Sequence, residues 1–416
     1  MLARISIESV CRRMSLSEAK VSILILALGT GMSTPATGQS QSESREDVPS
    51  IAQPPQSEPK REGSARFFDP EDGQLDVSYF LEDPRGFLPI PIVVTEPAVG
   101  YGAGGAGMFL RPRREAGEKG WAFPDISAAG GLVTQNGTWA AFGGDASRWL
   151  NGRLRTLAGA GTGQINLDFY GLGVDRSSFN EKVRYSLQFT GAIAQVNWQM
   201  ADSSPWAVGV RYVFADIDPK LRDEPAFPGL ANGLRVTVSA PTAIVEYDTR
   251  DNVFTPTRGV YSESSYLASR EALGATDNFE RFQQVLIGWY PAAASVTLGA
   301  RANYAWSSDG TPFFLRPFVQ LRGVPAVRYQ GDRAASLELE ARWQFHDRWS
   351  VVAFAGAGTT RTTREAFSVT QNVGSGGIGF RYELARKFGL HAGIDVAHSP
   401  GTTAVYFQVG SAWFRP

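Results

Sequence analysis

The sequence predicts an all-β fold: a transmembrane antiparallel β-barrel of about sixteen strands. The first observation is that residues 90–414 divide into short segments in which apolar and polar residues alternate. Because successive side chains of a strand point to opposite faces, each segment has one apolar and one polar face. The clearest apolar set is Leu337, Leu339, Ala341, Trp343 and Phe345. The second observation is an N-terminal export signal, which favours lipid rather than a soluble core against the apolar faces.

The N-terminus predicts secretion. A short apolar run at residues 21–28 follows basic residues and precedes the small residues Ala36-Thr37-Gly38. This order is typical of a signal peptide, here residues 1–38, and translation could start at Met1 or Met14. The only cysteine, Cys11, lies within it. We therefore expect no disulfide and no cysteine metal site in the mature chain.

Residues 39–87 separate this signal from the barrel, which we place at residues 88–416. Residues 39–65 are rich in Ser, Gln, Glu and Pro, and predict a disordered periplasmic tail. Residues 66–89 are mixed, and could form a short plug or a lead-in to the first strand. The formal net charge of −1 gives no indication of nucleic-acid binding. No apolar run approaches the length of a membrane-spanning helix.

The expected strands are separated by turns of unequal length. We predict strands at 90–97, 99–111, 121–134, 137–149, 153–166, 182–199, 205–217, 233–249, 259–270, 278–292, 294–307, 334–346, 348–360, 374–386, 388–397 and 402–414. Connections after the fourth, sixth, tenth, twelfth and fourteenth strands are short, and those after the fifth, seventh, eleventh and thirteenth are long. This asymmetry is typical of outer-membrane barrels, in which short turns are periplasmic and long loops are extracellular. Around Gly191 the outward-facing set changes from Tyr185, Leu187 and Phe189 to Val196 and Trp198. Gly191 and Pro241 therefore predict bulges or bends.

Three stretches carry a resemblance to a known family. They are 89–102 (PIPIVVTEPAVGYG), 247–259 (YDTRDNVFTPTRG) and 321–323 (LRG). Together they resemble bacterial surface-antigen barrels of the BamA/TamA outer-membrane superfamily. The motif residues of the second stretch are Asp248, Arg250, Asp251, Pro256 and Gly259.

The resemblance implies a loop tip, Arg322-Gly323, that folds back into the lumen and is held there. By alternation Glu338, Glu340 and Arg342 point into the same lumen. A guanidinium suits carboxylate partners, so Glu338 and Glu340 are the expected ones. A solvated loop arginine is the alternative. The acidic residue that the family carries on the thirteenth strand is absent from Phe354-Ala355-Gly356-Ala357-Gly358.

The resemblance also implies a weak seam between the first and last strands. Seam residues expected on this basis are Gly100, Gly102, Gly104, Gly105, Gln408, Gly410, Trp413 and Phe414. The family's final aromatic is followed here by Arg415-Pro416. We expect no folded periplasmic domain before the barrel, because residues 39–87 leave no room for one.

The function expected from the resemblance is assistance in inserting or translocating envelope proteins. Expected partners are outer-membrane lipid and lipopolysaccharide, unfolded outer-membrane client proteins and a separate periplasmic subunit. The alternative is a passive pore or lipid-contacting barrel of the porin class. No enzyme activity and no cofactor are expected.

Three further sequence patterns each have a functional and a structural explanation. Gly100, Gly102 and Gly105 spell G-x-G-x-x-G, but residues 108–112 continue as strand rather than helix. A hydrolase is suggested weakly by His391, Asp395 and His398, without a nucleophile motif. An acidic loop could hold calcium, although a solvated loop is favoured. Its residues are Asp216, Asp218, Asp223 and Glu224.

Overall fold

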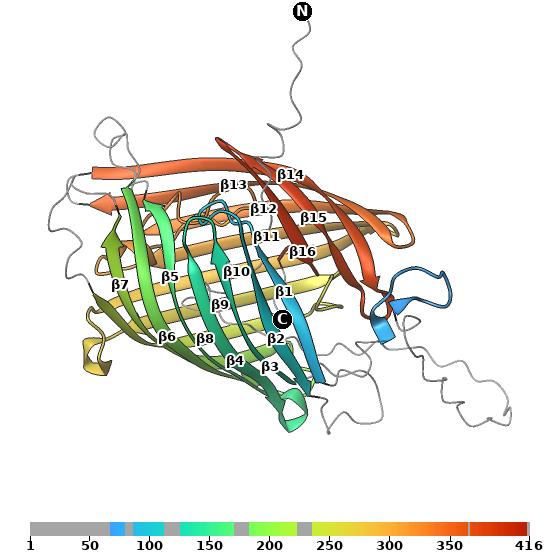
Figure 1. Cartoon of the computed structure of the whole chain (residues 1–416), viewed down its shortest axis with the longest axis horizontal. Helices are drawn as coiled ribbons and strands as arrows, with labels where there is room; N and C mark the ends of the chain where they lie inside the picture. Colours follow the sequence, from blue (N-terminus) through green and yellow to red (C-terminus); the bar gives the residue numbers. More distant parts are fainter. Residues whose placement is uncertain are drawn as a thin grey trace, which may run out of the picture.

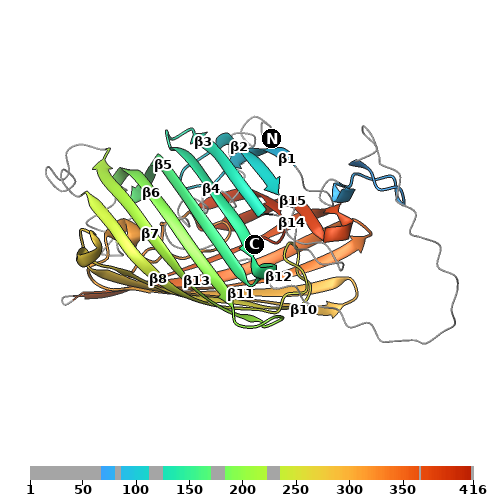
Figure 2. The same ribbon diagram turned by 90° about the horizontal axis from the view of Figure 1, so that it is seen from below.

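One antiparallel sheet of sixteen strands, in the order β1 to β16, forms the body of the protein. This computed structural model describes residues 67–79, 86–111, 125–169, 183–222, 235–364 and 367–413. The predictions for the signal peptide, for most of the tail and for Phe414 lie outside these residues. Figures 1 and 2 show the sheet curled back on itself, so that β2–β4 lie opposite β11–β13. The predicted barrel fold is confirmed.

The strands have the following bounds: β1 Gly86–Val94, β2 Gly102–Arg111, β3 Asp125–Thr134, β4 Trp139–Trp149, β5 Leu154–Phe169, β6 Val183–Gln199, β7 Trp206–Leu221, β8 Val236–Asp248, β9 Gly259–Ser269, β10 Phe279–Ala293, β11 Val296–Ser307, β12 Arg333–His346, β13 Trp349–Arg364, β14 Phe367–Ala385, β15 Leu390–Ser399 and β16 Thr402–Val409. Short 3-10 turns lie at η2 Leu150–Gly152, η3 Glu271–Leu273, η4 Phe313–Leu315 and η5 Arg386–Phe388.

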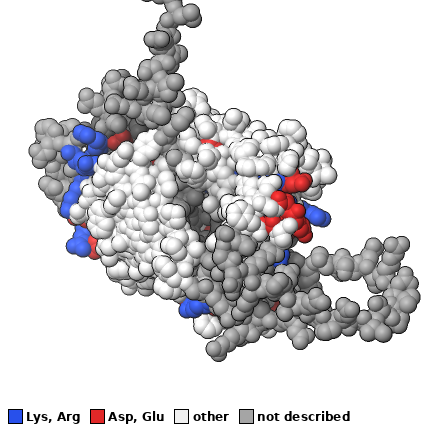
Figure 3. All heavy atoms as spheres, turned by 45° about the vertical axis from the view of Figure 1, so that its right-hand side comes forward, with Lys and Arg blue, Asp and Glu red and all other residues white. Residues whose placement is uncertain are grey.

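The outer wall of the sheet is apolar. The predicted outward set of β12 is exposed, with Leu339 at 54% and Trp343 at 53%. Figure 3 shows an uncharged wall with charged side chains gathered at its two ends. An apolar belt between polar rims matches the requirements of a bilayer. No helix among the described residues is both long and apolar enough to cross a bilayer.

Three details of the strand prediction are wrong. The long connection expected after the thirteenth strand is replaced by strand, because β13 and β14 pair as far as Arg364 and Phe367. Residues 361–373 are rich in β-branched Thr and Val, which favour extended backbone. The final strand ends at Val409, because Gly410 turns the chain with a φ of 81°. No bulge occurs at Gly191, where β6 pairs in continuous register with β5 and β7.

The absence of that bulge changes which face of β6 is apolar. Tyr185, Leu187 and Phe189 are buried and share the inner face with Gln195 and Asn197. They belong to an apolar cluster that also contains Ile92 of β1. Side chains of the β11–β12 loop, including Phe314 and Val327, pack into the same cluster. The loop 308–332 therefore fills the end of the lumen near the predicted extracellular side.

Candidate functional site

The tip of the loop 308–332 is pinned inside the barrel by Arg322. Its guanidinium lies 2.9 Å from Glu338 and 2.7 Å from Glu340, both on β12. The Phe354 ring of β13 lies 3.5 Å below it. Arg322 is only 1% exposed, because strands and loop enclose it. Carboxylates crowd around the guanidinium, so its pKa is held above the ordinary value although burial alone would lower it.

Gly323 fixes the same tip to the last two strands. Its backbone N–H donates to the Tyr406 hydroxyl of β16 at 2.7 Å, and its carbonyl accepts from Ser399 of β15 at 2.7 Å. Its φ is 87°, and a Cβ there would lie 3.1 Å from the Cβ of Ala397. Only glycine adopts this turn without strain against that neighbour. Arg322-Gly323 thus contacts β12, β13, β15 and β16.

A third carboxylate completes the loop-tip cluster. Asp395 on β15 lies 2.9 Å from Arg322 and also accepts two bonds from Arg381 of β14. It is fully buried. The acid missing from the thirteenth strand is therefore matched by a carboxylate from two strands further on, which the family motif does not indicate. Only the alternation of residues 390–396 could have pointed to it, since that alternation turns Asp395 inward.

The loop 308–332 also contacts the end of the sheet that is formed by β1. The Ala326 N–H donates to Glu96, which follows β1, at 2.8 Å. Glu96 is 5% exposed, and burial raises its pKa to about 7 even though two backbone N–H groups favour its charged form. Residues 322–326 therefore join the two ends of the sheet on the inside. Glu96 belongs to the stretch 89–102 that carries the family resemblance, but nothing in the sequence predicts its contact with the loop 308–332.

Replacing Glu96 is expected to change the pH dependence of stability. The folded-state pKa of about 7 exceeds the ordinary 4.5, so the folded barrel holds a proton that the unfolded chain has lost. Stability then falls as pH rises from about 4.5 to about 7. The Glu96→Gln variant does not show this loss, which amounts to at most about 3 kcal/mol of unfolding free energy in the unaltered protein. Thermal unfolding at pH 5 and pH 8 measures it; identical pH profiles for the two proteins would contradict it.

Residues 411–413 turn inward instead of extending the last strand. The Trp413 indole N–H donates to Glu338 at 2.6 Å, and its ring packs against Trp289 of β10. Trp413 is 3% exposed. The sequence placed it at the seam as part of the last strand; the structure places it inside, in contact with the loop-tip cluster. The turn that brings Trp413 inside begins at Gly410.

The motif residues at 248–259 form a turn at the predicted periplasmic end. Asp248 and Arg250 make a buried bidentate pair, with the Arg250 side chain 4.5 Å from the Tyr261 ring. Asp251 accepts backbone bonds from Thr257 and Arg258. Gly259 has a φ of 106°, and a Cβ there would lie 2.3 Å from the Thr249 carbonyl.

This turn crosses to the opposite wall of the barrel. Asn252 donates to the Phe388 carbonyl at 2.9 Å, and Ser411 donates to the Phe254 carbonyl at 2.5 Å. The Pro256 carbonyl accepts from Arg342 at 3.3 Å. The sequence predicts that Arg342 belongs to the residues around the loop tip. Its hydrogen bonds instead go to this turn and to Thr297. A second segment therefore spans the lumen.

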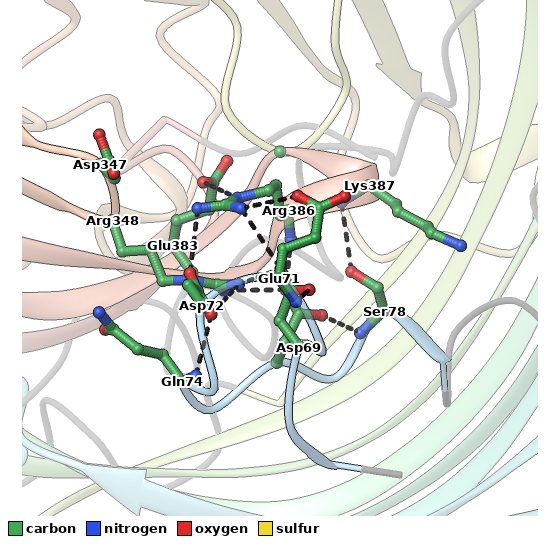
Figure 4. Close-up of polar contacts among 12 residues, drawn as sticks. Asp69, Glu71, Asp72, Gln74, Ser78, Asp347, Arg348, Glu383, Arg386 and Lys387 are labelled. Atoms are coloured by element: carbon green, nitrogen blue, oxygen red, sulfur yellow. Dashed lines mark hydrogen bonds and ion pairs between the residues drawn. The ribbon is translucent and has the colours of Figure 1, made fainter. Parts of the chain in front are cut away.

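The lead-in segment docks on the rim of the sheet at the same end. Arg348, between β12 and β13, contacts Asp69, Asp72 and Asp76 at 2.6, 2.5 and 2.8 Å and has no exposed surface. Figure 4 shows Arg348 and Arg386 beside Asp69 and Asp72 of the segment 67–79. The hydrogen bond from Arg348 is the largest reason that the pKa of Asp72 is lowered. The Val77 N–H donates to the Leu384 carbonyl. The sequence predicts either a plug or a lead-in to the first strand for residues 66–89. The part described at 67–79 lies at the rim of the sheet.

The seam lies between β1 and β16, because no ladder joins these strands among the described residues. Gly102, Gly104 and Gly105 lie on β2, one strand away from the seam. There β2 pairs with β1 on one side and with β3 on the other. Gly100 lies in the preceding turn with a φ of 77°. The four glycines therefore lie close to the seam but not on its edge. Gln408 lies on β16, at the edge itself.

The other patterns find structural roles. Asp216 and Asp218 lie in β7 rather than in a loop, paired with Arg235 and Lys220. Asp223 and Glu224 lie outside the described residues, and the described part contains no metal-ligating cluster. Asp395 is paired with arginines, while His398 bonds Thr403 on the outer face. The glycines at 102 and 105 lie in a strand.

These features define a class: a sixteen-stranded outer-membrane-type barrel with an inward loop, an inward Trp413 after the last strand and a seam between its end strands. The fold is similar to BamA from Haemophilus ducreyi, a crystal structure lacking POTRA domains 1-3, at TM-score 0.51 and 10% identity, over 75% of this chain and 65% of that one. It is also similar to CdiB from Escherichia coli, at TM-score 0.54 and 11% identity, over 78% of this chain and 62% of that one.

This likeness is one of fold, since the identities are low. The matched region spans a little under two thirds of both structures. No protein-family model matches the chain, and no curated protein does. The resemblance inferred from three sequence stretches is thus confirmed at the level of the barrel.

Proposed function

We propose that this protein resides in the outer membrane and assists insertion or translocation of other envelope proteins by pairing an incoming strand at the β1/β16 seam. The observation that carries the proposal is a sheet that ends in two strands, β1 and β16, which no ladder joins in the described part of the chain. Strand addition at an edge uses backbone groups and needs no catalytic side chain. The partners are lipid and lipopolysaccharide around the wall and unfolded barrel proteins at the seam.

Two ties across the seam suit an edge that opens and closes. Inside, the loop tip binds β16 through Gly323 and reaches Glu96 beyond β1 through Ala326. At the rim, the segment 67–79 binds the β12–β13 and β14–β15 turns and continues along the chain to β1. Both ties include hydrogen bonds or ion pairs, which can break and re-form. A separate periplasmic subunit would act at this rim.

The insertion proposal is tested with purified barrel in phosphatidylcholine vesicles. We expect a urea-unfolded outer-membrane barrel added from outside to become protease-protected several-fold faster than in vesicles that contain a closed porin. Equal rates in the two kinds of vesicle would contradict the proposal. In cells, deletion of the gene is expected to lower the abundance of at least one outer-membrane protein. Unchanged abundance of all of them would count against it.

A passive pore is less well supported. The loop 308–332 packs into an apolar cluster on one side, and Asn252 and Phe254 reach the opposite wall on the other. Such crossings obstruct a water-filled path. Conductance in planar bilayers separates the two functions, since a large steady open state would favour the pore.

A further inference from the structure

Prolines within the sheet lie where a neighbouring ladder stops. Pro219 of β7 pairs with β6, but the β7–β8 ladder ends before it at Ile217. Pro241 of β8 pairs with β7, but the β8–β9 ladder begins only at Thr242. A proline has no N–H to give to the strand it faces, so pairing on that side is interrupted.

The first strand carries two such prolines. The β1–β2 ladder runs from Gly86 to Val94 without a register shift, through Pro89 and Pro91. In an antiparallel pair, hydrogen-bonding residues alternate along the strand. Two prolines spaced by two residues leave the ladder intact only if the even-numbered residues bond to β2. The backbone groups of Pro89 and Pro91 are therefore turned toward the seam, and neither can donate.

The last strand presents a complete edge. The β15–β16 hairpin closes at the pair Ser399 and Thr402, and the Gly410 N–H donates to His391 of β15. Even-numbered residues of β16 thus bond to β15. Thr403, Val405, Phe407 and Val409 turn their backbone groups toward the seam, and each has an N–H. The side chains of Phe407 and Val409 are 39% and 59% exposed on the outer wall.

We infer that the seam is one-sided: an incoming antiparallel strand pairs with β16, while Pro89 and Pro91 close the edge of β1 to it. The expected occupant is an extended segment of an unfolded barrel protein, with apolar side chains on its lipid face. Against β1, two of its carbonyls would remain without a donor inside the bilayer, where water cannot replace them. Against β16, every carbonyl finds an N–H. This inference rests on the proposed function and adds which edge is used.

The test uses single cysteines on the two edges in a Cys11→Ser background, with the full-length barrel in phosphatidylcholine vesicles. Phe407→Cys and Val409→Cys report on β16, and Phe87→Cys and Val93→Cys report on β1. The probe is a peptide with the sequence of β12, Arg333–His346, carrying Leu339→Cys. Disulfide adducts formed with copper–phenanthroline are then quantified by mass spectrometry. Leu337→Cys, on the outer wall away from the seam, gives the level of random collision.

We expect adducts on β16 to exceed those on β1 at least about tenfold, because two hydrogen bonds are lost at β1. Replacing Pro89 and Pro91 together by alanine restores both donors and keeps the β1–β2 ladder, so adducts on β1 should rise toward those on β16. Pro219→Ala, inside the wall, should change neither.

Each contrary outcome is informative. Equal adducts on the two edges of the unaltered barrel, or no response to the paired proline replacement, overturn the one-sided seam. If vesicle insertion is accelerated while adducts gather on β1, the proposed function stands and the edge assignment fails. Adducts at the collision level on both edges, with no acceleration of insertion, overturn both.

Discussion

The Arg322→Ala variant is expected to lose about 3–5 kcal/mol of stability, the usual cost of removing one partner from a buried charge cluster. Glu338 and Glu340 would then lie buried without their main cation, and Asp395 would retain only Arg381. The loop tip would also lose its contact with the Phe354 ring. We expect the barrel to lose its compact electrophoretic mobility at a clearly lower temperature, and the loop 308–332 to be cut faster by protease.

Two further variants give this prediction its controls. Arg322→Lys keeps the charge but not the planar fork, so an intermediate loss is expected. Arg333→Ala removes an exposed arginine at the start of β12 and should change stability by less than about 0.5 kcal/mol. The prediction fails if Arg322→Ala unfolds at the same temperature as Arg333→Ala. In that case the loop tip contributes little to holding the last strands.

The Arg348→Ala variant is expected to release the segment 67–79 from the rim. Asp69, Asp72 and Asp76 would lose the cation that compensates their mutual repulsion, at a cost of about 2–5 kcal/mol to docking. Cleavage at Asp72 by an Asp-specific protease should become much faster, while the sheet remains folded. Arg153→Ala at another turn is the matched control, because its partner Asp202 is 83% exposed.

Acid is expected to have a similar effect on the unaltered protein. The pKa of Asp72 is lowered from 3.8 by Arg348, so docking is fully stabilised above the ordinary value and weakens as pH falls through the lowered one. Cleavage by an acid-tolerant protease should therefore rise only below about pH 4. A segment that is cut equally fast in Arg348→Ala and Arg153→Ala, or one that is released near neutral pH, would argue against electrostatic docking.

The fold could be predicted from the sequence because alternation is a local property. Residues 337–345 have the apolar and charged faces expected of a wall strand, whatever the rest of the chain does. The alternation of residues 390–396 likewise turns Asp395 to the inner face, where it is buried. Where the prediction was wrong, a longer-range effect decided the outcome. The apolar trio at 185–189 was assigned to lipid, but the loop 308–332 supplies an apolar surface inside the barrel for it.

The loop-tip contacts were predictable in part. Arg322 and its two β12 carboxylates followed from the resemblance and from alternation, and the structure brings them together. Asp395, Trp413 and Glu96 lie 73, 91 and 226 residues from Arg322 along the chain, and no local pattern shows that they contact the loop tip. Arg348 and the acids at 69–76 are a similar case, since the hydrogen-bonded partners are more than 270 residues apart.

The sequence by itself determined the sixteen strands, the lipid-facing side chains of β12 and the missing donors of Pro89 and Pro91, because strand periodicity and proline chemistry act within a few residues. Only the tertiary structure decided which carboxylates surround Arg322, where Trp413 lies, and that the two ends of the sheet meet without a ladder. Those features depend on how the sheet curls. Curling brings distant segments together in a lumen where a buried charge must find a partner or pay its full cost of desolvation.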